Sequence, residues 1–423
     1  MKPLTRAAII AVGSELLTPL RMDTNSLFIT EKLNALGIEV VMKGVAGDDR
    51  EELAHLFGSA RERTDLVVFS GGLGPTDDDV TREVVAATLG RTLAEDVAMT
   101  ERMRVRFAAR GYQGPMPEIN RRQAMVPDGA VVIENSRGSA PGLWLDDGDA
   151  VVLLLPGPPR ELRPMLETLV DGPLGARAAG APLIRRVLKI AGRIESQTDE
   201  ALQPLYREWE QATPRISATI LAALGQIELH VSARSSSADA ARSVLETAVQ
   251  RVCAVLGEDV FSTDGKSMEA VVGEMLAARR YRIALGESCT GGLVSSRLTD
   301  VAGSSRYVER AVVAYANEAK TELLGVSQLL IEEHGAVSEP VAIAMAEGAR
   351  ASAGVDVALG VTGIAGPGGG SAEKPVGTVA IAAVVGSTTR VRTFRFHGER
   401  EQVKFQASQA ALDMVRRLLL SGS

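Results

Sequence analysis

Apolar runs and helically spaced segments alternate along the first 70 residues. Residues 7–12 are a fully apolar run, residues 38–46 have a strand-like pattern, and residues 65–70 have the pattern of a buried strand. Residues 24–36 and 50–63 lie between them and carry apolar side chains at helical spacing. Strands that are apolar throughout and alternate with helices predict a parallel sheet covered on both faces. Ligands of such sheets bind at the carboxyl ends of the strands.

This alternation stops near residue 171 and resumes near residue 263. Residues 171–182 are rich in small residues and lack periodicity, which predicts a linker. Residues 183–262 combine strand-like and helical patterns in a smaller α+β module, and residues 400–420 form a long amphipathic helix. The sequence therefore predicts two α/β domains with mainly parallel sheets that flank a small α+β module. The expected domains are residues 1–172, 173–262 and 263–423.

The amino-acid composition excludes several classes of protein and indicates a cellular compartment. The 423 residues are 45% hydrophobic, enough for more than one core, and the net charge of −7 disfavours nonspecific binding of nucleic acids or anionic membranes. The two cysteines, Cys253 and Cys289, cannot form a disulfide framework or a four-cysteine zinc site. No apolar run approaches the roughly 20 residues of a membrane helix, and the N-terminal run lacks a signal-peptide pattern. We therefore expect a cytoplasmic protein without membrane partners.

Five uncommon peptides mark the last domain as a candidate catalytic unit. They are GESCTGG (286–292), AYANEAK (314–320), VTGIAGPGGG (361–370), EKPVGT (373–378) and HGER (397–400). Ser288 follows an apparent strand and precedes a glycine-bearing helix start, where backbone N–H groups can face an oxyanion. A serine alcohol needs a base. The four histidines lie outside the strongest of these peptides, although His397 is at HGER, and this disfavours a Ser-His-Asp triad. Lys320 is the better candidate base if burial or a neighbouring cation removes its charge.

Together these peptides resemble the C-terminal domain of the CinA (competence/damage-inducible) family, whose standalone relatives are nicotinamide-mononucleotide deamidases. The resemblance implies a cofactor-free amidohydrolase with Ser288 as nucleophile and Lys320 as base. It gives Tyr315, Thr362 and Arg400 supporting roles. This chain has Glu399 where relatives commonly have an aspartate, and the difference affects only the orientation of the Arg400 side chain. The remaining expected pocket residues are Gly291, Gly292, Asn317, Gly363 and Lys374.

Each of these residues also has a simpler interpretation. Ser288 could be a helix N-cap, and Lys320 could be a solvated helix residue. Cys289 is the rival nucleophile, because thiolates are intrinsically better nucleophiles than alcohols. The glycine-rich loop at 361–370 could be only a flexible connection, although glycines also let backbone approach a phosphate closely.

Four peptides of the first domain indicate a second nucleotide site. They are AVGSELL (11–17), MDTNS (22–26), SGGLGPTDDDVT (70–81) and LPGPPRE (155–161). They resemble the molybdopterin-binding fold of molybdenum-cofactor synthesis proteins and, more closely, the N-terminal half of full-length CinA proteins. The resemblance implies an ADP-ribose pyrophosphatase that depends on a divalent Mg, Mn or Co ion.

The residue chemistry of the second site is compatible with a phosphate and a hard cation. Backbone N–H groups at glycines can bind phosphate, and carboxylates can hold a divalent cation that bridges phosphate oxygens. The simpler interpretation of the acidic run at 77–79 is a solvated helix cap. The expected substrate residues are Gly71, Gly72, Gly74, Thr76 and Asp78, and the expected metal ligands are Asp23 and Asp79.

The middle module resembles the KH-like module of full-length CinA proteins. Residues 183–262 contain no GXXG clamp, so we expect no RNA binding and interpret the module as a spacer or a dimerisation element. The resemblance also implies a homodimer. Two other functions stay open: a molybdopterin-binding or adenylyl-transfer protein, and a nonenzymatic partner in competence or recombination.

Overall fold

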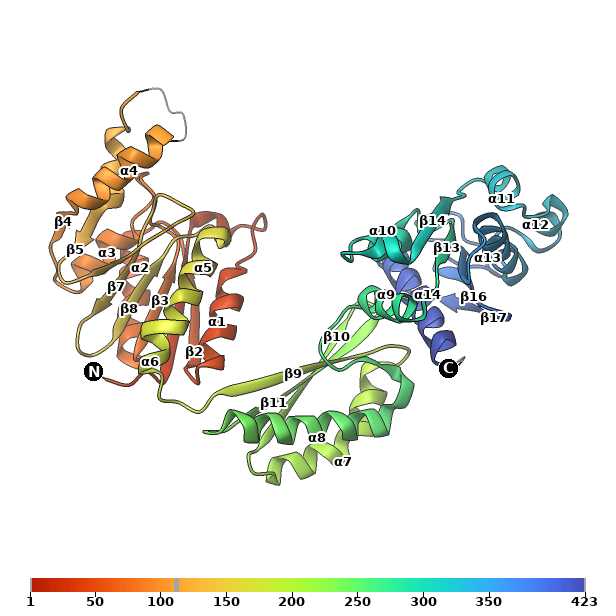
Figure 1. Ribbon diagram of the computed structural model, residues 1–423, viewed down its shortest axis with the longest axis horizontal. Helices are drawn as coiled ribbons and strands as arrows, with labels where there is room; N and C mark the ends of the chain where they lie inside the picture. The colour runs from red at the N-terminus through yellow and green to blue at the C-terminus, as the bar shows by residue number, and fades with distance from the viewer. Residues whose placement is uncertain (1, 110–113, 422–423) are drawn as a thin grey trace. The chain divides into compact units, whose positions relative to one another are not determined.

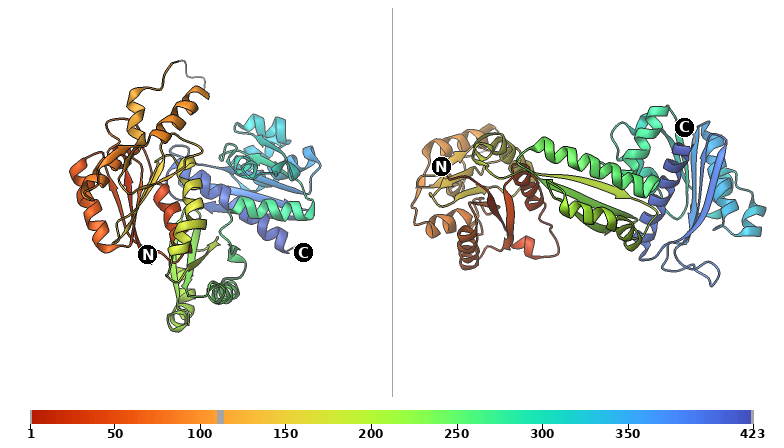
Figure 2. Two further views of the ribbon diagram at one scale, coloured as in Figure 1. Left: turned by 60° about the vertical axis from the view of Figure 1, so that its left-hand side comes forward. Right: turned by 90° about the horizontal axis from the view of Figure 1, so that it is seen from below.

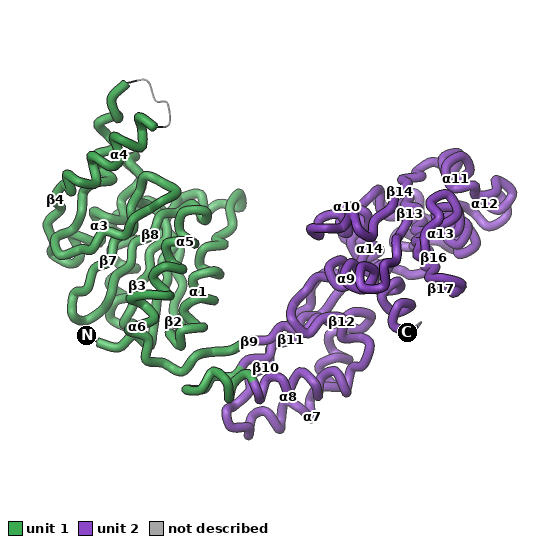
Figure 3. Tube along the Cα trace, in the orientation of Figure 1, with its two compact units in different colours: residues 1–184, 233–242 green, residues 185–232, 243–423 purple. Residues whose placement is uncertain are grey.

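A computed structural model of the protein describes residues 2–109 and 114–421. Contacts divide the chain into two compact units (Figure 3). The first unit holds residues 1–184 and 233–242, and the second holds residues 185–232 and 243–423. The middle segment therefore groups largely with the C-terminal segment by its contacts, and the three-domain division stays a prediction.

The first unit is built on a six-stranded sheet in the order β2-β1-β3-β8-β7-β6 (Figure 1). The strands β2, β1, β3 and β8 are parallel, whereas β7 and β6 pair antiparallel at one edge. Their bounds are Arg6–Val12 (β1), Glu39–Ala46 (β2), Leu66–Ser70 (β3), Val131–Ile133 (β6), Gly142–Asp146 (β7) and Val151–Leu155 (β8). The central strands are buried on both faces, as their continuous apolar sequences require.

Helices cover both faces of this sheet. The helices α1 (Asn25–Ala35) and α5 (Pro159–Leu169) pack on one face, and α2 (Arg50–Arg63) and α3 (Thr81–Thr88) pack on the other. The remaining elements are η1 (Ser14–Leu17), β4 (Leu93–Glu95), α4 (Val97–Ala109), η2 (Glu118–Ala124), β5 (Met125–Pro127), η3 (Val170–Leu174) and α6 (Gly175–Arg177). The segment predicted as a linker thus begins with helical turns, because Leu174 is buried in the core beside α5.

The middle segment forms a four-stranded sheet in the order β10-β11-β9-β12. Every second residue of β11 is buried from Ile227 onward, the pattern of a strand with one covered face. The helix α7 buries Leu202, Leu205 and Trp209. The bounds are Leu183–Ile190 (β9), Glu195–Gln211 (α7), Ile216–Ala223 (β10), Gln226–Arg234 (β11), Ala238–Leu256 (α8), Gly257–Asp259 (η4) and Val260–Ser262 (β12).

The C-terminal segment holds a five-stranded sheet in the order β14-β13-β15-β16-β17. The strands β14, β13 and β15 are parallel, but β16 and β17 are antiparallel. Although β16 is apolar throughout, a loop without a crossover helix connects it to β15, so the chain must reverse direction. The predicted α/β class is confirmed, with antiparallel strands added at one edge. The bounds are Ile283–Glu287 (β13), Val308–Val313 (β14), Val357–Gly363 (β15), Thr378–Val385 (β16) and Thr388–Arg395 (β17).

Two sets of helices enclose this sheet (Figure 2). The helices α9 (Met268–Arg279), α10 (Leu293–Thr299) and α14 (Arg400–Ser421) cover one face. The opposite face is covered by α11 (Asn317–Leu324), α12 (Gln328–His334) and α13 (Glu339–Ala353), and η5 (Ser304–Arg306) precedes β14. None of the helices in the described ranges is long and apolar enough to span a bilayer.

Candidate active sites

Three of the predicted peptides meet where the parallel strands of the C-terminal sheet end. Ser288 directly follows β13, Tyr315 follows β14, and Thr362 is near the end of β15. The amide of Ser288 donates to the carbonyl oxygen of Val361 over 2.9 Å. The amide of Ala314 donates to the carbonyl oxygen of Glu287 over 2.8 Å. These bonds hold the peptides at 286–292, 314–320 and 361–370 at one edge of the sheet.

The buried carboxylate of Glu287 fixes the turn that follows Ser288. It accepts hydrogen bonds from the amides of Gly292 (3.1 Å), Val294 (3.1 Å) and Ser295 (2.9 Å). The side chain is 1% exposed, so these bonds satisfy a charge removed from water. Three amides at the start of α10 are therefore not available to an oxyanion. The amides of Cys289 and Thr290 donate to no oxygen in the described part of the chain.

Lys320 is buried at 2% exposure on α11, next to the end of β14. Its Nζ donates to the carbonyl oxygens of Tyr315 (3.3 Å) and Ala316 (3.5 Å), and no carboxylate among the described residues pairs with it. Burial lowers the pKa of Lys320 below its ordinary value. Burial thus shifts the pKa of Lys320 in the direction that a lysine base needs. No hydrogen bond joins Lys320 Nζ to Ser288 Oγ among the described residues.

The environment of Cys289 disfavours the rival nucleophile. The side chain is 5% exposed, and burial raises the pKa of its thiol to about 12. A thiol in this state stays protonated near neutral pH and is a weak nucleophile. Cys289 and Lys320 lie close enough for the charge of each to affect the pKa of the other.

The remaining predicted residues of this site fall into two groups. Arg400, at the start of α14, contacts two of the other peptides: its Nη2 donates to the hydroxyl oxygen of Tyr315 and its Nη1 to the carbonyl oxygen of Gly366, each over 2.6 Å. Thr362 is buried and donates from Oγ1 to the carbonyl oxygen of Ala336 over 2.8 Å. This hydrogen bond joins the end of β15 to the segment that precedes α13.

The other pocket residues have mainly structural contacts. Asn317 is exposed at the first position of α11, and Lys374 donates from Nζ to the carbonyl oxygen of His334 over 2.8 Å. A Cβ atom on Gly363 would lie 2.7 Å from the side chain of Val379. Gly291 and Gly292 adopt positive φ angles of 61° and 90°, a conformation that favours glycine.

Two polar side chains that sequence reasoning missed lie at this turn. A Cβ atom on Gly291 would lie 3.6 Å from Lys404 Nζ, and Lys404 has no hydrogen bond or ion pair among the described residues. Thr290 Oγ1 is buried without a hydrogen-bond partner in the described chain. Lys404 lies four residues after Arg400 on the same helix face, and this spacing was the available signal.

The second candidate site is a cavity of about 370 Å³ in the first unit, at the carboxyl ends of β1, β3 and β8. The predicted residues Gly71, Gly72, Gly74, Asp78 and Asp79 line it, whereas Thr76 and Asp23 do not. Five further residues with polar side chains in its lining are Glu15, Asp48, Gln123, Ser139 and Glu161.

The glycines of this loop permit close backbone packing. A Cβ atom on Gly71 would lie 2.3 Å from the carbonyl oxygen of Val12, and one on Gly72 would lie 2.0 Å from Thr81 Oγ1. The amide of Gly71 donates to Leu155 and that of Gly74 to Asp79, so neither is free for a phosphate. The amides of Gly72 and Leu73, which also line the cavity, have no acceptor in the described chain.

The carboxylates of Asp79 and Asp23 both accept hydrogen bonds from backbone amides of nearby residues, and these bonds fix the conformation of the loops that carry them. Asp79 accepts from the amides of Gly74 (2.7 Å) and Thr76 (2.9 Å) and from Thr76 Oγ1 (2.6 Å). Asp23 accepts from the amide of Ser26 over 3.0 Å at the start of α1. Within residues 2–109 and 114–421, no group of three or more His, Cys, Asp or Glu side chains is arranged to hold a metal ion.

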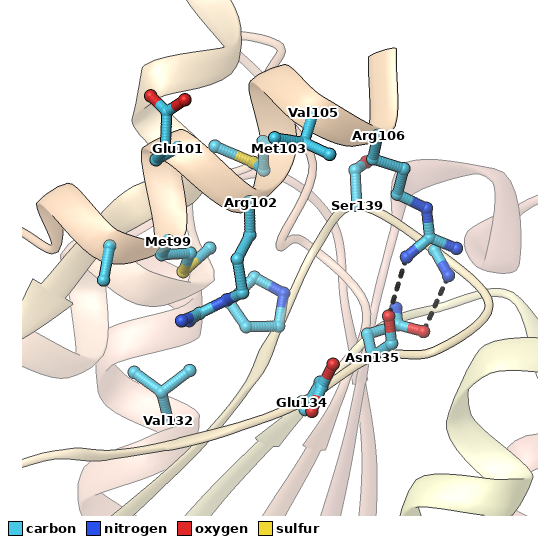
Figure 4. Close-up of a pocket in the computed structure, with 13 residues that line it drawn as sticks. Met99, Glu101, Arg102, Met103, Val105, Arg106, Val132, Glu134, Asn135 and Ser139 are labelled. Atoms are coloured by element: carbon cyan, nitrogen blue, oxygen red, sulfur yellow. Dashed lines mark hydrogen bonds between the residues drawn. The ribbon is translucent and has the colours of Figure 1, made fainter. Parts of the chain in front are cut away.

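A larger cavity of about 590 Å³ adjoins this site beneath α4 (Figure 4). Met99 and Arg102 of α4 point toward the segment that carries Val132 and Glu134. Ser139 lines both cavities, and Asn135, which lines the larger one, donates from Nδ2 to Glu161 over 2.8 Å. The two cavities therefore share a wall.

Comparison with known proteins covers nearly all of the chain. Residues 8–176 match the family described as "Probable molybdopterin binding domain", residues 185–262 the "Damage-inducible protein CinA KH domain", and residues 265–419 the "CinA C-terminal domain". A CinA-like protein of Koribacter versatilis is 44% identical over 418 residues, which are 98% of this chain and 100% of that protein. The chain belongs to the CinA family. Another CinA-like protein, from Acidobacterium capsulatum, is 45% identical over 418 residues, again 98% of this chain and 100% of the relative.

Solved structures of CinA proteins correspond to parts of this chain. The competence/damage inducible protein CihA of Agrobacterium tumefaciens is 36% identical and covers 36% of this chain and 96% of its own, with a TM-score of 0.35. A CinA protein of unknown function from Thermoplasma acidophilum is 34% identical and covers 40% of this chain and 97% of its own, with a TM-score of 0.38.

Proposed function

We propose that this CinA protein hydrolyses the carboxamide of nicotinamide mononucleotide to nicotinic acid mononucleotide and ammonia. The observation that carries the proposal is the buried Lys320, which has a lowered pKa and no carboxylate partner and lies at the same sheet edge as Ser288. Acyl transfer without histidine needs at least a serine nucleophile and a neutral amine that acts as its general base. The raised pKa of Cys289 supports the serine as nucleophile.

The proposed reaction has two halves. Neutral Lys320 takes the proton of Ser288 Oγ as the oxygen attacks the carboxamide carbon, and the resulting ammonium returns a proton to the leaving nitrogen. The C–N bond breaks, ammonia departs, and a nicotinoyl ester of Ser288 remains. Water then adds to the ester with Lys320 as base, which releases the carboxylate and regenerates the serine. The amides of Cys289 and Thr290, which donate to no oxygen in the described part of the chain, would stabilise the oxyanion in both halves.

The cations of α14 are suited to the substrate phosphate. The guanidinium of Arg400 presents its donors in a fixed planar fork, so we assign it to binding and orientation rather than to proton transfer. Lys404 lies near Gly291, and its side chain has no partner among the described residues, so it would supply a second positive charge beside the turn that follows Ser288.

A product assay on the full chain tests this function. Nicotinamide mononucleotide is incubated with the purified protein, and ammonia and nicotinic acid mononucleotide are measured with and without a chelator. Equimolar formation of both products, independent of the chelator and abolished by Ser288→Ala, supports the proposal. Failure of the native chain to release ammonia refutes it.

We also propose that the first unit cleaves ADP-ribose to AMP and ribose 5-phosphate. The observation that favours this second activity is the pair of adjoining cavities, one lined by free backbone amides and carboxylates and one by apolar side chains of α4. The free amides of Gly72 and Leu73 are suited to a phosphate. The larger cavity has room for a nucleoside.

The carboxylates of this cavity have the chemistry that a hard divalent cation requires. Mg²⁺ commonly takes one or two carboxylates together with substrate phosphates, so a group of three protein ligands is unnecessary. Asp78 and Glu15 line the cavity and would hold such an ion in preference to Asp79, whose carboxylate already accepts three hydrogen bonds. A hydrogen bond from Thr76 lowers the pKa of Asp78, which favours its charged form. When bound, the cation would neutralise charge on the diphosphate.

Adding back Mg, Mn or Co separately to chelator-treated protein and measuring AMP formation from ADP-ribose tests this activity. AMP formation that returns with a metal supports it.

Retained pterin in purified protein, without turnover of ADP-ribose, would favour the molybdopterin-binding alternative. A salt-dependent DNA titration addresses the nonenzymatic alternative, and a native mass measurement tests the proposed homodimer.

A further inference from the structure

The largest cavity described in the second unit lies apart from both candidate sites and has a volume of about 860 Å³. The β9–α7 turn, the β10–β11 turn, strand β17 and helix α14 form its walls. Specific contacts hold these walls together: Gln409 of α14 donates to Gln226 over 3.2 Å, and Arg417 donates to Asp259 over 2.8 Å. We call this cavity the β17 groove. Its volume falls within the range of small-molecule pockets.

One wall of the β17 groove is a column of planar groups. Residues 390, 392, 394 and 396 follow the two-residue period of a strand and its extension, so they share one face. The Arg392 guanidinium lies 4.7 Å from the centre of the Phe394 ring, and the Phe394 and Phe396 rings stack at 5.4 Å with an interplanar angle of 8°. Guanidinium and phenyl planes are the groups on which proteins stack heteroaromatic rings.

The positive charges of the β17 groove are not all neutralised from within. Arg193 and Arg417 pair with Asp259, and Arg417 also pairs with Asp413. The side chains of Arg390 and Arg392 make no hydrogen bond or ion pair among the described residues. Two cations therefore face the groove without an acidic partner. This arrangement is suited to an anionic ligand.

Free backbone amides add to this anion preference. The helix α7 has 17 residues and begins in the wall of the groove, where Ile194 provides no side-chain cap. The amides of residues 195–197 donate to no acceptor in the described chain, and Glu195 is the acidic side chain in the first turn of α7. Amides at such a helix start bind phosphate well.

We propose that the β17 groove is a binding site for a nucleoside monophosphate. The phosphate binds the α7 amides and the unpaired arginines, and the heteroaromatic ring stacks on the column that ends at Phe396. Gln197 and Gln406 line the same groove and offer amide groups to the edge of the base. The proposal is independent of the deamidase and pyrophosphatase activities.

Hydrogen exchange on the full chain with AMP as the probe locates the site directly. Amides 195–197 exchange fast in the free protein, because they lack acceptors, and slow as AMP saturates the groove. Peptides that cover residues 388–398 gain protection at the same AMP concentrations. Adenosine and inorganic phosphate, each missing one half of the ligand, bind about tenfold or more weakly.

Matched variants separate the groove from other nucleotide sites. Arg392→Gln and Arg390→Gln each weaken protection by AMP about tenfold or more. Arg395→Gln is the control, since Arg395 lies on the same strand but does not line the groove; it leaves AMP binding unchanged. Phe396→Leu weakens AMP binding but not binding of inorganic phosphate.

Several results would overturn the proposal. Saturating AMP that leaves residues 195–197 in fast exchange, or protects only the loop at 70–81 or the turn at 286–292, excludes the β17 groove. Equal binding of adenosine and AMP excludes the phosphate contacts. Protection that follows protein concentration instead of AMP shows that a second copy of the chain covers the groove, and this also refutes the ligand site.

Discussion

Arg400 Nη2 donates a hydrogen bond to the hydroxyl oxygen of Tyr315 over 2.6 Å, although the two residues lie 85 positions apart in the chain. The same guanidinium holds the carbonyl oxygen of Gly366. One cation thus links the peptide after β14 to the glycine-rich loop after β15. The orientation of the Arg400 guanidinium depends on these two acceptors, because a guanidinium donates its hydrogen bonds in one plane.

Removing the Tyr315 hydroxyl should weaken the binding of nicotinamide mononucleotide more than it slows the chemical steps. For Tyr315→Phe we expect the KM for nicotinamide mononucleotide to rise about three- to tenfold with little change in kcat, since one charged hydrogen bond is lost. Steady-state ammonia release measures both constants. Tyr281→Phe is the matched control, because Tyr281 precedes β13 at the opposite edge of the sheet. A large fall in kcat with unchanged KM would contradict the binding role of Arg400.

The nucleophile assignment predicts a specific order among three variants. Ser288→Ala and Lys320→Met should each lower ammonia release about 10³-fold or more, because each removes half of the nucleophile–base pair. Cys289→Ala should keep activity within about tenfold of the native rate, since its thiol stays protonated. Initial rates at saturating substrate give the comparison. An active Ser288→Ala protein together with an inactive Cys289→Ala protein would transfer the role to the thiol.

Burial of Lys320 predicts a pH-dependent cost to stability. The pKa in the folded chain lies below its value in the unfolded chain, so unfolding takes up a proton between the two values and stability rises with pH there. Lys320→Met should therefore raise Tm most below the folded pKa. Its advantage should shrink as pH approaches about 10.4, the usual pKa of lysine.

Thermal unfolding at several pH values checks this prediction. Lys404→Met is the control, because Lys404 is only partly buried and its substitution removes the same charge. A gain in Tm that grows with pH, or an equal gain in the control, would show that Lys320 carries no desolvation penalty.

The bonds of Asp79 predict that it shapes the phosphate loop rather than binding metal. Asp79→Asn keeps one acceptor but loses the charge that holds three donors, so we expect at least a tenfold higher KM for ADP-ribose with an unchanged metal requirement. Asp77→Asn should have little effect, because the Asp77 side chain is fully exposed and its one ion pair among the described residues is with Arg122. AMP formation across a metal titration distinguishes the roles. A weakened metal dependence in Asp79→Asn would make Asp79 a ligand.

The regular elements could be predicted from the sequence where pattern and environment agree. The helix α2 spans the predicted residues 50–63, and β1 and β3 coincide with their apolar runs within one residue. The strand β17 was missed because six of its eight residues are exposed and its sequence, TTRVRTFR, lacks a buried face. Its pairing with β16 makes it a strand, and no local pattern contains that information.

The sequence by itself determined the order of the elements, the CinA resemblance and the peptides that end the parallel strands. Strand ends converge in any such sheet, so the candidate residues Ser288, Tyr315 and Thr362 could be brought together without coordinates. Only the tertiary structure decided which of their neighbours are free to act. Hydrogen bonding and burial are properties of the packed chain: Glu287 occupies the amides of α10, while burial lowers the pKa of Lys320 and raises that of Cys289.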